Sequence, residues 1–373
     1  MKTEISRVPV PSDAAQPPSP EGFRSGGMDD KAILQELEEL ARATFLLWDE
    51  RWMGFSWRHY YFNHTQRVRA LSLEIGRREG ADLRKIEYAA LLHDITKRYD
   101  GRIVSDKDGN RIVDENGFWR NELSMPNPDR QNKITELYRA HRQFYKLHNI
   151  SGGFIAQKLL QRYGLPDKFC RAVETIIRAH LKPDAIPLEE IQEVDCATES
   201  KALYEADTID ANLGLVAFFR NIHIYTHRTL ETTEEVDPPG RLRVGDLRKY
   251  IEHLPRWLDM KEDFVGRMMT DTGRQIARAR QGRKREIYRQ IEEEQARFDL
   301  SLKYGLLGIV QYFMDGNGDP DLRKQMDDLH RVWIPERARM LHNAGPDTGP
   351  AQTSFDRAVH FCRLMEGEIS GKI

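Results

Sequence analysis

Apolar residues recur at helical spacing along most of this 373-residue chain, and this pattern constrains the fold more than any other feature. Asp29 is a typical acidic cap, and the helix that it begins would bury a face formed by Ile33, Leu37 and Leu40. Further helices are predicted at residues 63–79, 82–100, 151–163, 167–181, 199–225 and 267–304. The pattern therefore predicts an all-α fold.

The chain divides into three predicted parts. Residues 1–28 contain five prolines and few large apolar side chains, which is typical of a disordered tail. Residues 29–230 form the main helical domain, and 231–373 form a C-terminal helical region behind a polar linker. Within the main domain, residues 101–130 contain two short β-branched runs around Asp108-Gly109, and this arrangement predicts a small β-hairpin insertion.

The composition excludes several classes of partner and location. The net charge of -2 offers no global excess that would attract nucleic acid. The longest apolar runs, such as residues 213–219, are too short to span a bilayer, and the first residues lack the apolar region of a secretory signal. Three widely spaced cysteines suit a reducing compartment. We therefore expect a cytoplasmic protein that binds neither membrane nor nucleic acid.

His93 and Asp94 are adjacent within a strongly apolar predicted helix. A buried carboxylate needs a partner or a metal ion, and a buried imidazole needs both of its nitrogens satisfied. The simpler interpretation is that each side chain makes hydrogen bonds with neighbouring groups. The pair becomes more informative when the other histidines and aspartates are considered.

Further candidate ligands lie on or beside separate predicted helices. His64 lies at the start of one helix, His148 precedes another, and His180 lies in the last turn of the next. Asp207 and Asp210 share one face of a further helix, three residues apart. Imidazoles and carboxylates without thiolates suit Mn, Fe, Ni, Co or Zn, and they argue against a structural zinc. Packed together, these helices would form a transition-metal site.

Residues 56–225 resemble the HD superfamily of metal-dependent phosphohydrolases, including its dinuclear subgroup. The matching segments are HTQRV from His64, LLHDITK around His93, KLHNISGGFIAQKLL around His148, IIRAHL around His180, and ALYEADTIDANLG around Asp207. The resemblance implies an HD-domain helical bundle, extended here by the hairpin insertion and by the C-terminal helices.

The resemblance also implies a set of metal ligands. The first position would be held by His64, His93, Asp94 and Asp207, and the second by His148 and His180. Asp94 would bridge the two positions. Asp210 would orient a ligand histidine, or would replace Asp207 as a ligand. We expect one or two divalent ions per chain and favour two.

The expected chemistry is hydrolysis by a metal-activated hydroxide of a phosphoester or phosphoanhydride in a nucleotide or related small phosphorylated metabolite. Asp94 and Lys97 would be the catalytic residues, and Lys97, one turn beyond His93, would bind phosphate. Its alternative role is that of a cation at a helix end. The weaker candidates for substrate binding are Arg98, Trp119, Arg120 and Arg130. For the three arginines, the simpler interpretation is that they lie on the solvated surface.

The insertion at residues 101–130 interrupts the ligand-bearing helices, so both of its ends must emerge near the metal site. Its aromatic and guanidinium groups suit stacking on a base and contact with phosphate, which predicts a flap that sets substrate choice. A surface hairpin without function is the alternative.

Two other functions remain open from the sequence alone. The same ligands could activate dioxygen, as in the di-iron oxygenases of the HD superfamily. A non-catalytic sensing or scaffolding module with a structural metal is the other alternative. In that case the region 231–373 would be the effector or assembly part, and its helices could mediate homo-oligomerisation.

Overall fold

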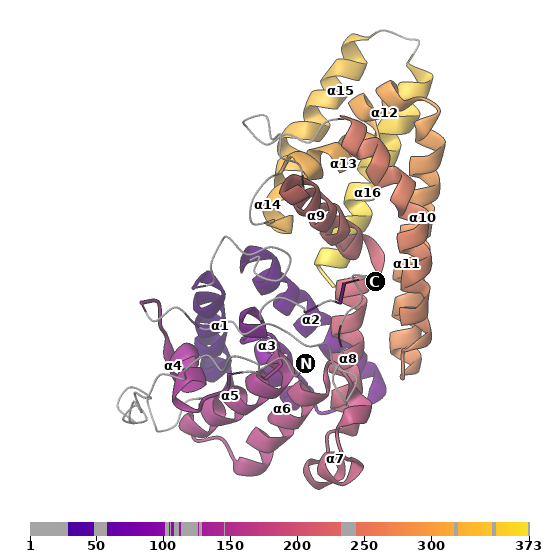
Figure 1. Cartoon of the computed structure of the whole chain (residues 1–373). Helices are drawn as coiled ribbons and strands as arrows, with labels where there is room; N and C mark the ends of the chain where they lie inside the picture. The colour runs from indigo at the N-terminus through magenta and orange to yellow at the C-terminus, as the bar shows by residue number, and fades with distance from the viewer. Residues whose placement is uncertain are drawn as a thin grey trace.

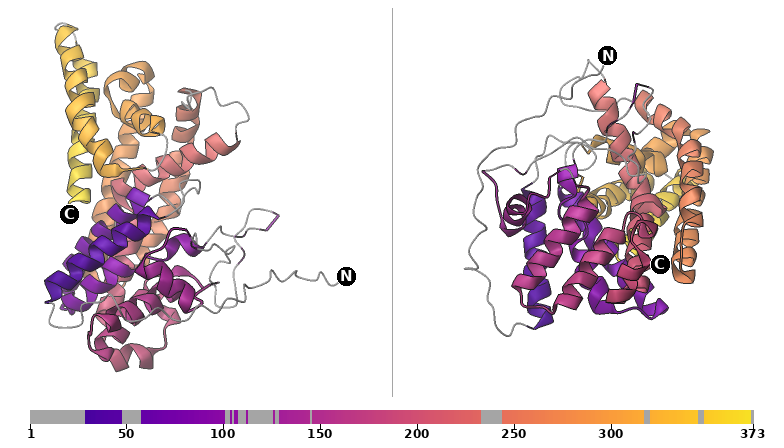
Figure 2. Two further views of the ribbon diagram at one scale, coloured as in Figure 1. Left: turned by 90° about the vertical axis from the view of Figure 1, so that its left-hand side faces the viewer. Right: turned by 60° about the horizontal axis from the view of Figure 1, so that its bottom comes forward.

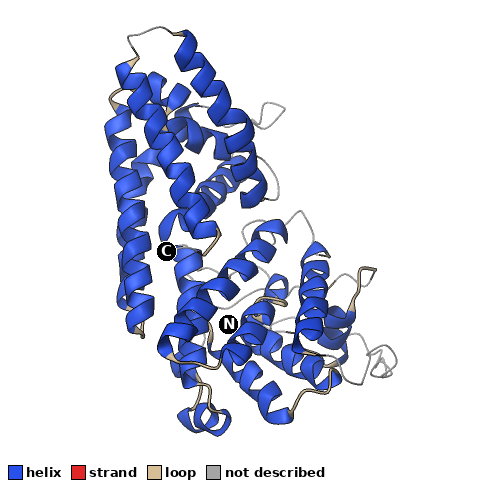
Figure 3. Cartoon of the chain, turned by 180° about the vertical axis from the view of Figure 1, so that it is seen from behind, coloured by secondary structure: helices blue, strands red, loops and turns tan. Residues whose placement is uncertain are grey.

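The computed structural model describes most of the chain and is helical throughout this part. The described residues are 29–47, 58–100, 104, 106–107, 112, 126, 129–144, 146–232, 244–316, 320–344 and 348–371. No strand is assigned among them (Figure 3), so the all-α prediction is confirmed. The predicted tail and most of the linker lie outside the described residues.

The predicted β-hairpin is not seen. Most of residues 101–128 lie outside the described part, and the few that are described contain no strand. One backbone hydrogen bond crosses the segment, from the Ile112 N–H to the Val104 carbonyl at 3.0 Å. A single hydrogen bond is less than the repeated ladder that defines a strand pair.

The first eight α-helices surround one buried apolar core, and we call them the N-terminal bundle (Figure 1). Their bounds are α1 Asp30–Leu46, α2 Arg58–Glu79, α3 Leu83–Leu92, α4 Lys133–Ala140, α5 His148–Arg162, α6 Asp167–Ala179, α7 Leu188–Val194 and α8 Ala197–Asn212. Short 3-10 helices follow α3 and α6, η1 at Lys97–Asp100 and η2 at Pro183–Ala185. Helix α2 packs against α3 and α8, and α5 packs against α6.

The remaining helices surround a second buried core, and we call them the C-terminal bundle. Their bounds are α9 Gly214–Thr232, α10 Val244–Gly266, α11 Asp271–Gln295, α12 Phe298–Tyr304, α13 Leu306–Asp315, α14 Leu322–Asp328, η3 Leu329–Trp333, α15 Ile334–Asn343 and α16 Gly349–Ile369. The two views of Figure 2 show the same two groups from other sides.

Helix α11 belongs to both bundles. Ile276 and Ala277, near its start, lie in the first core, whereas Ile287, Tyr288 and Ile291 lie in the second. A single continuous helix therefore carries apolar contacts from one core to the other. Among the described residues, no helix combines the length and the apolar character that crossing a membrane requires.

Four of the predicted helices differ from the structure in their bounds or are divided into two. The helix expected at 82–100 stops at Leu92, and the one expected from 151 begins at His148. The helix expected at 199–225 is divided at Gly214, whose φ of +80° is a left-handed conformation that breaks helical geometry. The predicted helix at 267–304 is similarly divided into α11 and α12.

Candidate metal centre

Four buried histidines converge between α2, α3, α5 and α6, and each has its Nδ1 atom against an acceptor. The acceptors are the Asp210 carboxylate for His64 at 2.7 Å, the Ala90 carbonyl for His93 at 2.8 Å, the Asp100 carboxylate for His148 at 2.5 Å and the Ile177 carbonyl for His180 at 2.6 Å. Carbonyl and ionised carboxylate oxygens only accept, so each Nδ1 donates its proton. In a neutral imidazole the Nε2 atom is then left with a lone pair. His64 differs from the other three, because its Nε2 atom also lies 3.0 Å from a carboxylate oxygen of Asp207; burial lowers the pKa of His64, but the hydrogen bonds with Asp207 and Asp210 outweigh burial and raise it.

These four Nε2 atoms surround the carboxylate of Asp94, two on each oxygen. The distances are 3.6 Å from His64 and 3.5 Å from His93 to Oδ2, and 3.3 Å from His148 and 3.9 Å from His180 to Oδ1. Asp207 adds a second carboxylate, with Oδ1 at 3.0 Å from the His64 Nε2 atom. The structure thus brings all six predicted ligands into one buried cluster.

The donor set fits metal ions. His148 and His180 place their Nε2 atoms 3.1 Å apart, so two lone pairs face each other at contact distance. Among the described residues, the Nε2 atom of His93 is buried without a hydrogen-bond partner. A cation between these groups removes the repulsion and satisfies the orphaned nitrogen. Two sets of atoms are close enough to hold an ion, His64 with His93 and Asp94, and Asp94 with His148 and His180.

The charges of the cluster suit metal binding at neutral pH. Burial opposes ionisation of Asp94, but nearby Lys97 and His93 outweigh it and hold the pKa of this carboxyl well below its usual range. Burial together with the neighbouring imidazoles of His148 and His93 lowers the pKa of His180 to about 3. His180 is therefore neutral, and its lone pair is available, at any pH near neutrality.

Lys97 lies at the rim of the cluster, at the start of η1. Its Nζ atom is 3.0 and 3.1 Å from the two carboxylate oxygens of Asp94 and 5.5 Å from the centre of the Tyr61 ring. The side chains of Lys97 and Asp207 are 14% and 12% exposed, whereas that of Asp94 is fully buried. A ligand that enters the cluster therefore meets Lys97 and Asp207 first.

Asp210 lies on the far side of His64 from Asp207. It accepts the Nδ1 proton of His64, and it is also held by Arg67, whose Nε and Nη2 atoms donate at 2.8 and 3.0 Å. Burial opposes its ionisation, but Arg67 outweighs burial and holds the pKa of Asp210 well below its usual range. This position favours the orienting role over the alternative in which Asp210 replaces Asp207 as a ligand.

Two members of the site were missed by sequence reasoning. Arg67 lies one turn after His64, so its helical phase was a usable signal. Asp100 carried no such signal, because the expected helix at 82–100 would have placed it away from His148. The turn after Leu92 and the short helix η1 bring its carboxylate to that histidine instead.

Of the four weaker substrate-binding candidates, the structure describes Arg98 and Arg130. Arg98 is half-buried beside Lys97 in η1, and Arg130 is exposed. Phe118, Trp119 and Arg120 lie outside the described residues, and most of the proposed flap lies there with them.

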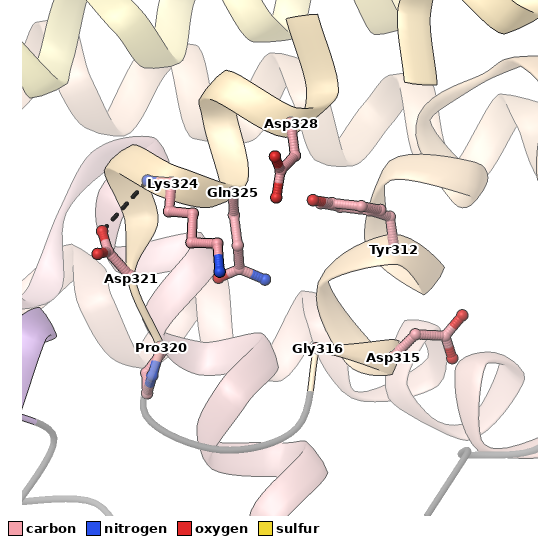
Figure 4. A pocket seen from close by; sticks show the side chains of 8 residues that line it. All are labelled: Tyr312, Asp315, Gly316, Pro320, Asp321, Lys324, Gln325 and Asp328. Atoms are coloured by element: carbon pink, nitrogen blue, oxygen red, sulfur yellow. Dashed lines mark hydrogen bonds between the residues drawn. The ribbon is translucent and has the colours of Figure 1, made fainter. Parts of the chain in front are cut away.

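A separate hollow of about 300 Å³ lies in the C-terminal bundle, between α13 and α14 (Figure 4). Its walls include Tyr312, Lys324 and the carboxylates of Asp315, Asp321 and Asp328. It contains none of the clustered histidines, so it is distinct from the metal centre.

Residues 61–212 match the family model of the HD domain. This segment contains all six residues of the cluster, from His64 to Asp207. Residues 61–212 of this chain therefore form an HD domain.

Solved structures of bacterial proteins resemble the chain. Bacillus subtilis YpgQ in complex with ADP is 18% identical, with a TM-score of 0.39 over 72% of this chain and 97% of that one. A predicted HD superfamily hydrolase from an uncultured Thermotogales bacterium is 20% identical, with a TM-score of 0.38 over 72% and 99%. The search of curated protein sequences gave no match.

Proposed function

We propose that this chain is a metal-dependent phosphohydrolase that cleaves a phosphoester or phosphoanhydride bond in a small phosphorylated metabolite. The observation that carries this proposal is the 3.1 Å contact between the Nε2 atoms of His148 and His180. Both nitrogens present lone pairs, and a carboxylate oxygen of Asp94 lies beside them. This is a strained arrangement for neutral imidazoles alone and a favourable one around a divalent ion.

The ligands divide into two positions that share one residue. His64, His93, Asp94 and Asp207 would hold the first ion, and Asp94, His148 and His180 the second. The two oxygens of Asp94 face opposite histidine pairs, which supports a bridging role. Imidazole and carboxylate ligands suit Mn, Fe, Co, Ni or Zn. When bound, divalent ions would lower the pKa of water and neutralise charge that develops on phosphoryl oxygens.

Lys97 would bind the phosphate of the substrate. Burial disfavours its ammonium group, but the Asp94 carboxylate outweighs burial and raises the pKa of Lys97 above its usual range. Lys97 therefore stays cationic at neutral pH, and it lies at the accessible rim of the cluster. Its single charge would orient a phosphate oxygen towards the metal positions and would stabilise the charge of the departing group.

The recessed cluster supports a small substrate. Lys97 and Asp207 expose only 14% and 12% of their side chains, so only a narrow group such as a terminal phosphate could reach both of them. Nucleotides are the first class to test, because they offer both phosphoester and phosphoanhydride bonds on a compact scaffold.

The test combines metal analysis of anaerobically purified protein with a phosphate-release screen over nucleotides and other phosphorylated metabolites. Wild-type protein should contain a transition metal and should release phosphate or pyrophosphate from at least one class. Asp94→Asn should lose both metal and turnover with an unchanged helical circular dichroism spectrum. The matched control, Asp129→Asn, changes an exposed aspartate and should retain both.

Three outcomes would contradict the proposal. Wild-type metal content and turnover in Asp94→Asn would show that the assigned cluster is wrong. Oxygen consumption with an organic substrate, without phosphate release, would establish an oxygenase of the same fold. A tightly bound metal with no turnover of any phosphorylated compound would establish a sensing or scaffolding module.

A further inference from the structure

A buried chain of charges leads from the metal centre into the C-terminal bundle. It begins at Asp210, which accepts the Nδ1 proton of His64 and is gripped by Arg67. The Nη1 atom of Arg280 lies 3.9 Å from the same carboxylate, and both of these residues are completely buried. Arg280 lies on α11, outside the segment 61–212 that matches the HD domain.

Arg280 is itself held by Glu368, near the end of α16. The Nη1 atom of Arg280 lies 4.0 Å from Oε2 of Glu368, and Nη2 donates to the Glu368 backbone carbonyl at 3.4 Å. The same carboxylate accepts the backbone N–H groups of Leu215 and Val216 at 2.8 and 3.3 Å, and Arg283 at 3.1 Å. Glu368 thus ties α16 to α11 and to the first turn of α9.

These contacts place three helices of the C-terminal bundle behind one ligand of the first metal position. The acceptor of a ligand histidine fixes the orientation of its ring and raises its basicity, so whatever fixes that acceptor also acts on the ligand. Asp210 has no contact with solvent, and its oxygens accept hydrogen bonds from Arg67 and His64. The guanidinium of Arg280 adds a second positive charge 3.9 Å from the same carboxylate, through a nitrogen that has no hydrogen-bond partner among the described residues.

We propose that Arg280 and Glu368 are positioning residues for His64, so that the C-terminal bundle completes the first metal position. This inference rests on the proposed role of His64 as a metal ligand. The second position is independent of this chain of charges, because His148 is oriented by Asp100.

The experiment measures Mn²⁺ binding to metal-free full-length protein by electron paramagnetic resonance, in a His148→Ala background that leaves the first position intact. Arg280→Met should weaken this binding by about 3- to 10-fold, which is less than the roughly 10- to 100-fold loss on removing a direct partner of a ligand histidine, because Arg280 acts on His64 through Asp210. Arg280→Lys keeps the charge and should recover part of the loss. Arg285→Met, on the same helix but 54% exposed, is the matched control and should bind as the background does.

The complementary experiment keeps His148 and follows the second position in a His64→Ala background, where Arg280→Met should leave Mn²⁺ affinity within about twofold. The thermal midpoint of each metal-free variant is measured alongside. Glu368→Gln provides a second variant if Arg280→Met does not fold. It retains an oxygen acceptor for α9 but removes the charge beside Arg280, and it should weaken the first position alone.

Unchanged affinity at the first position in both Arg280→Met and Glu368→Gln would overturn the inference. An equal loss at both positions would do the same, because it would indicate a general effect on folding. Phosphate release does not enter these measurements. Wild-type protein that binds Mn²⁺ selectively but hydrolyses nothing would therefore remove the proposed hydrolysis and leave this inference standing.

Discussion

At the scale of single residues, the metal centre depends on which nitrogen of each histidine carries the proton. In each half of the cluster, one histidine donates to a carboxylate and the other to a backbone carbonyl. The carboxylates are Asp210 in the first half and Asp100 in the second. Every sequence supplies backbone carbonyls, whereas Asp210 and Asp100 are particular side chains that orient a proposed ligand histidine.

The first residue-scale prediction concerns the number of ions. His148→Ala or His180→Ala should lower the metal content by about one ion per chain, because each removes a ligand from the second position only. Mass spectrometry of metal content after saturation with Mn²⁺ measures the change. His141→Ala, an exposed histidine nearby in the sequence, should behave as wild type. A wild-type protein that binds one ion at saturation would contradict the two-ion arrangement.

A second residue-scale prediction concerns Lys284, which is fully buried in α11. Burial and the neighbouring Lys261 lower its pKa from 10.5 to about 7. Between these two values the unfolded chain binds the extra proton, so stability rises with pH across this window: the penalty from burying Lys284 is complete at and below about pH 7 and disappears as pH rises towards 10.5. Lys284→Met should therefore raise the free energy of unfolding at pH 7 by roughly 2 to 4 kcal/mol.

Urea unfolding between pH 6 and pH 10 measures this effect. The variant should show a flatter dependence of stability on pH than the wild type, and the two curves should approach each other at the alkaline end. Lys168→Met, which alters an exposed lysine, is the control. Parallel curves for Lys284→Met and wild type would mean that the amine is already accommodated as a cation.

At the scale of elements, the order of the ligand-bearing helices could be predicted from apolar periodicity, but their ends could not. The stop at Leu92 has no glycine or proline to announce it. It depends on tertiary packing, since the Nδ1 atom of His93 donates to the Ala90 carbonyl and Gly152 lies against the His93 backbone.

The break at Gly214 is a second case in which the apolar spacing of neighbouring residues predicted the wrong end of a helix. The residues on both sides are apolar and helical in spacing, so the sequence continues the helix while the structure turns. The contacts of this turn lie far along the chain, because the Glu368 carboxylate occupies the space of a side chain at position 214 and accepts the backbone N–H of Leu215. A contact between residues about 150 positions apart cannot be predicted from the residues next to Gly214.

This break leads to the element-scale prediction. A Cβ atom at Gly214 would lie 2.5 Å from Oε2 of Glu368, and the backbone φ there is +80°. Gly214→Ala should therefore lower the free energy of unfolding by about 2 kcal/mol, because both strain and displacement of the carboxylate oppose it. Urea unfolding followed by circular dichroism measures the loss.

The control for this prediction is Gly282→Ala, in the interior of α11, where an added Cβ meets nothing within 4 Å. Alanine there should stabilise the protein by up to about 1 kcal/mol, since glycine is the weaker helix former. If both substitutions stabilise the protein, the left-handed turn at Gly214 is not a constraint on the fold.

At the scale of the whole molecule, the two bundles are not separable units. Met268, Ile276 and Ala277 belong to the first core although they lie beyond residue 230. A fragment of residues 29–230 would expose this surface and would lose the partner of Asp210 on α11. It should lack a cooperative unfolding transition and should bind less than one Mn²⁺ per chain.

Differential scanning calorimetry and near-ultraviolet circular dichroism of that fragment, beside the full chain, test this prediction. The full chain should give a cooperative transition and a structured aromatic spectrum. A fragment that unfolds cooperatively with undiminished metal content would show that the N-terminal bundle folds as an independent domain and does not need α11.

Because α11 belongs to both bundles, the N-terminal bundle cannot close during synthesis until α11 has been made. A ribosome that has finished residue 212 has already made all six proposed ligands, but the helix that closes their core is still unsynthesised. The proposed metal ligands therefore stay exposed to solvent during the synthesis of at least another 65 residues, until Ala277 has been added. During this interval, any ion that binds to these side chains is held by an incompletely folded chain. Such ions can exchange with solvent until α11 packs against the first core.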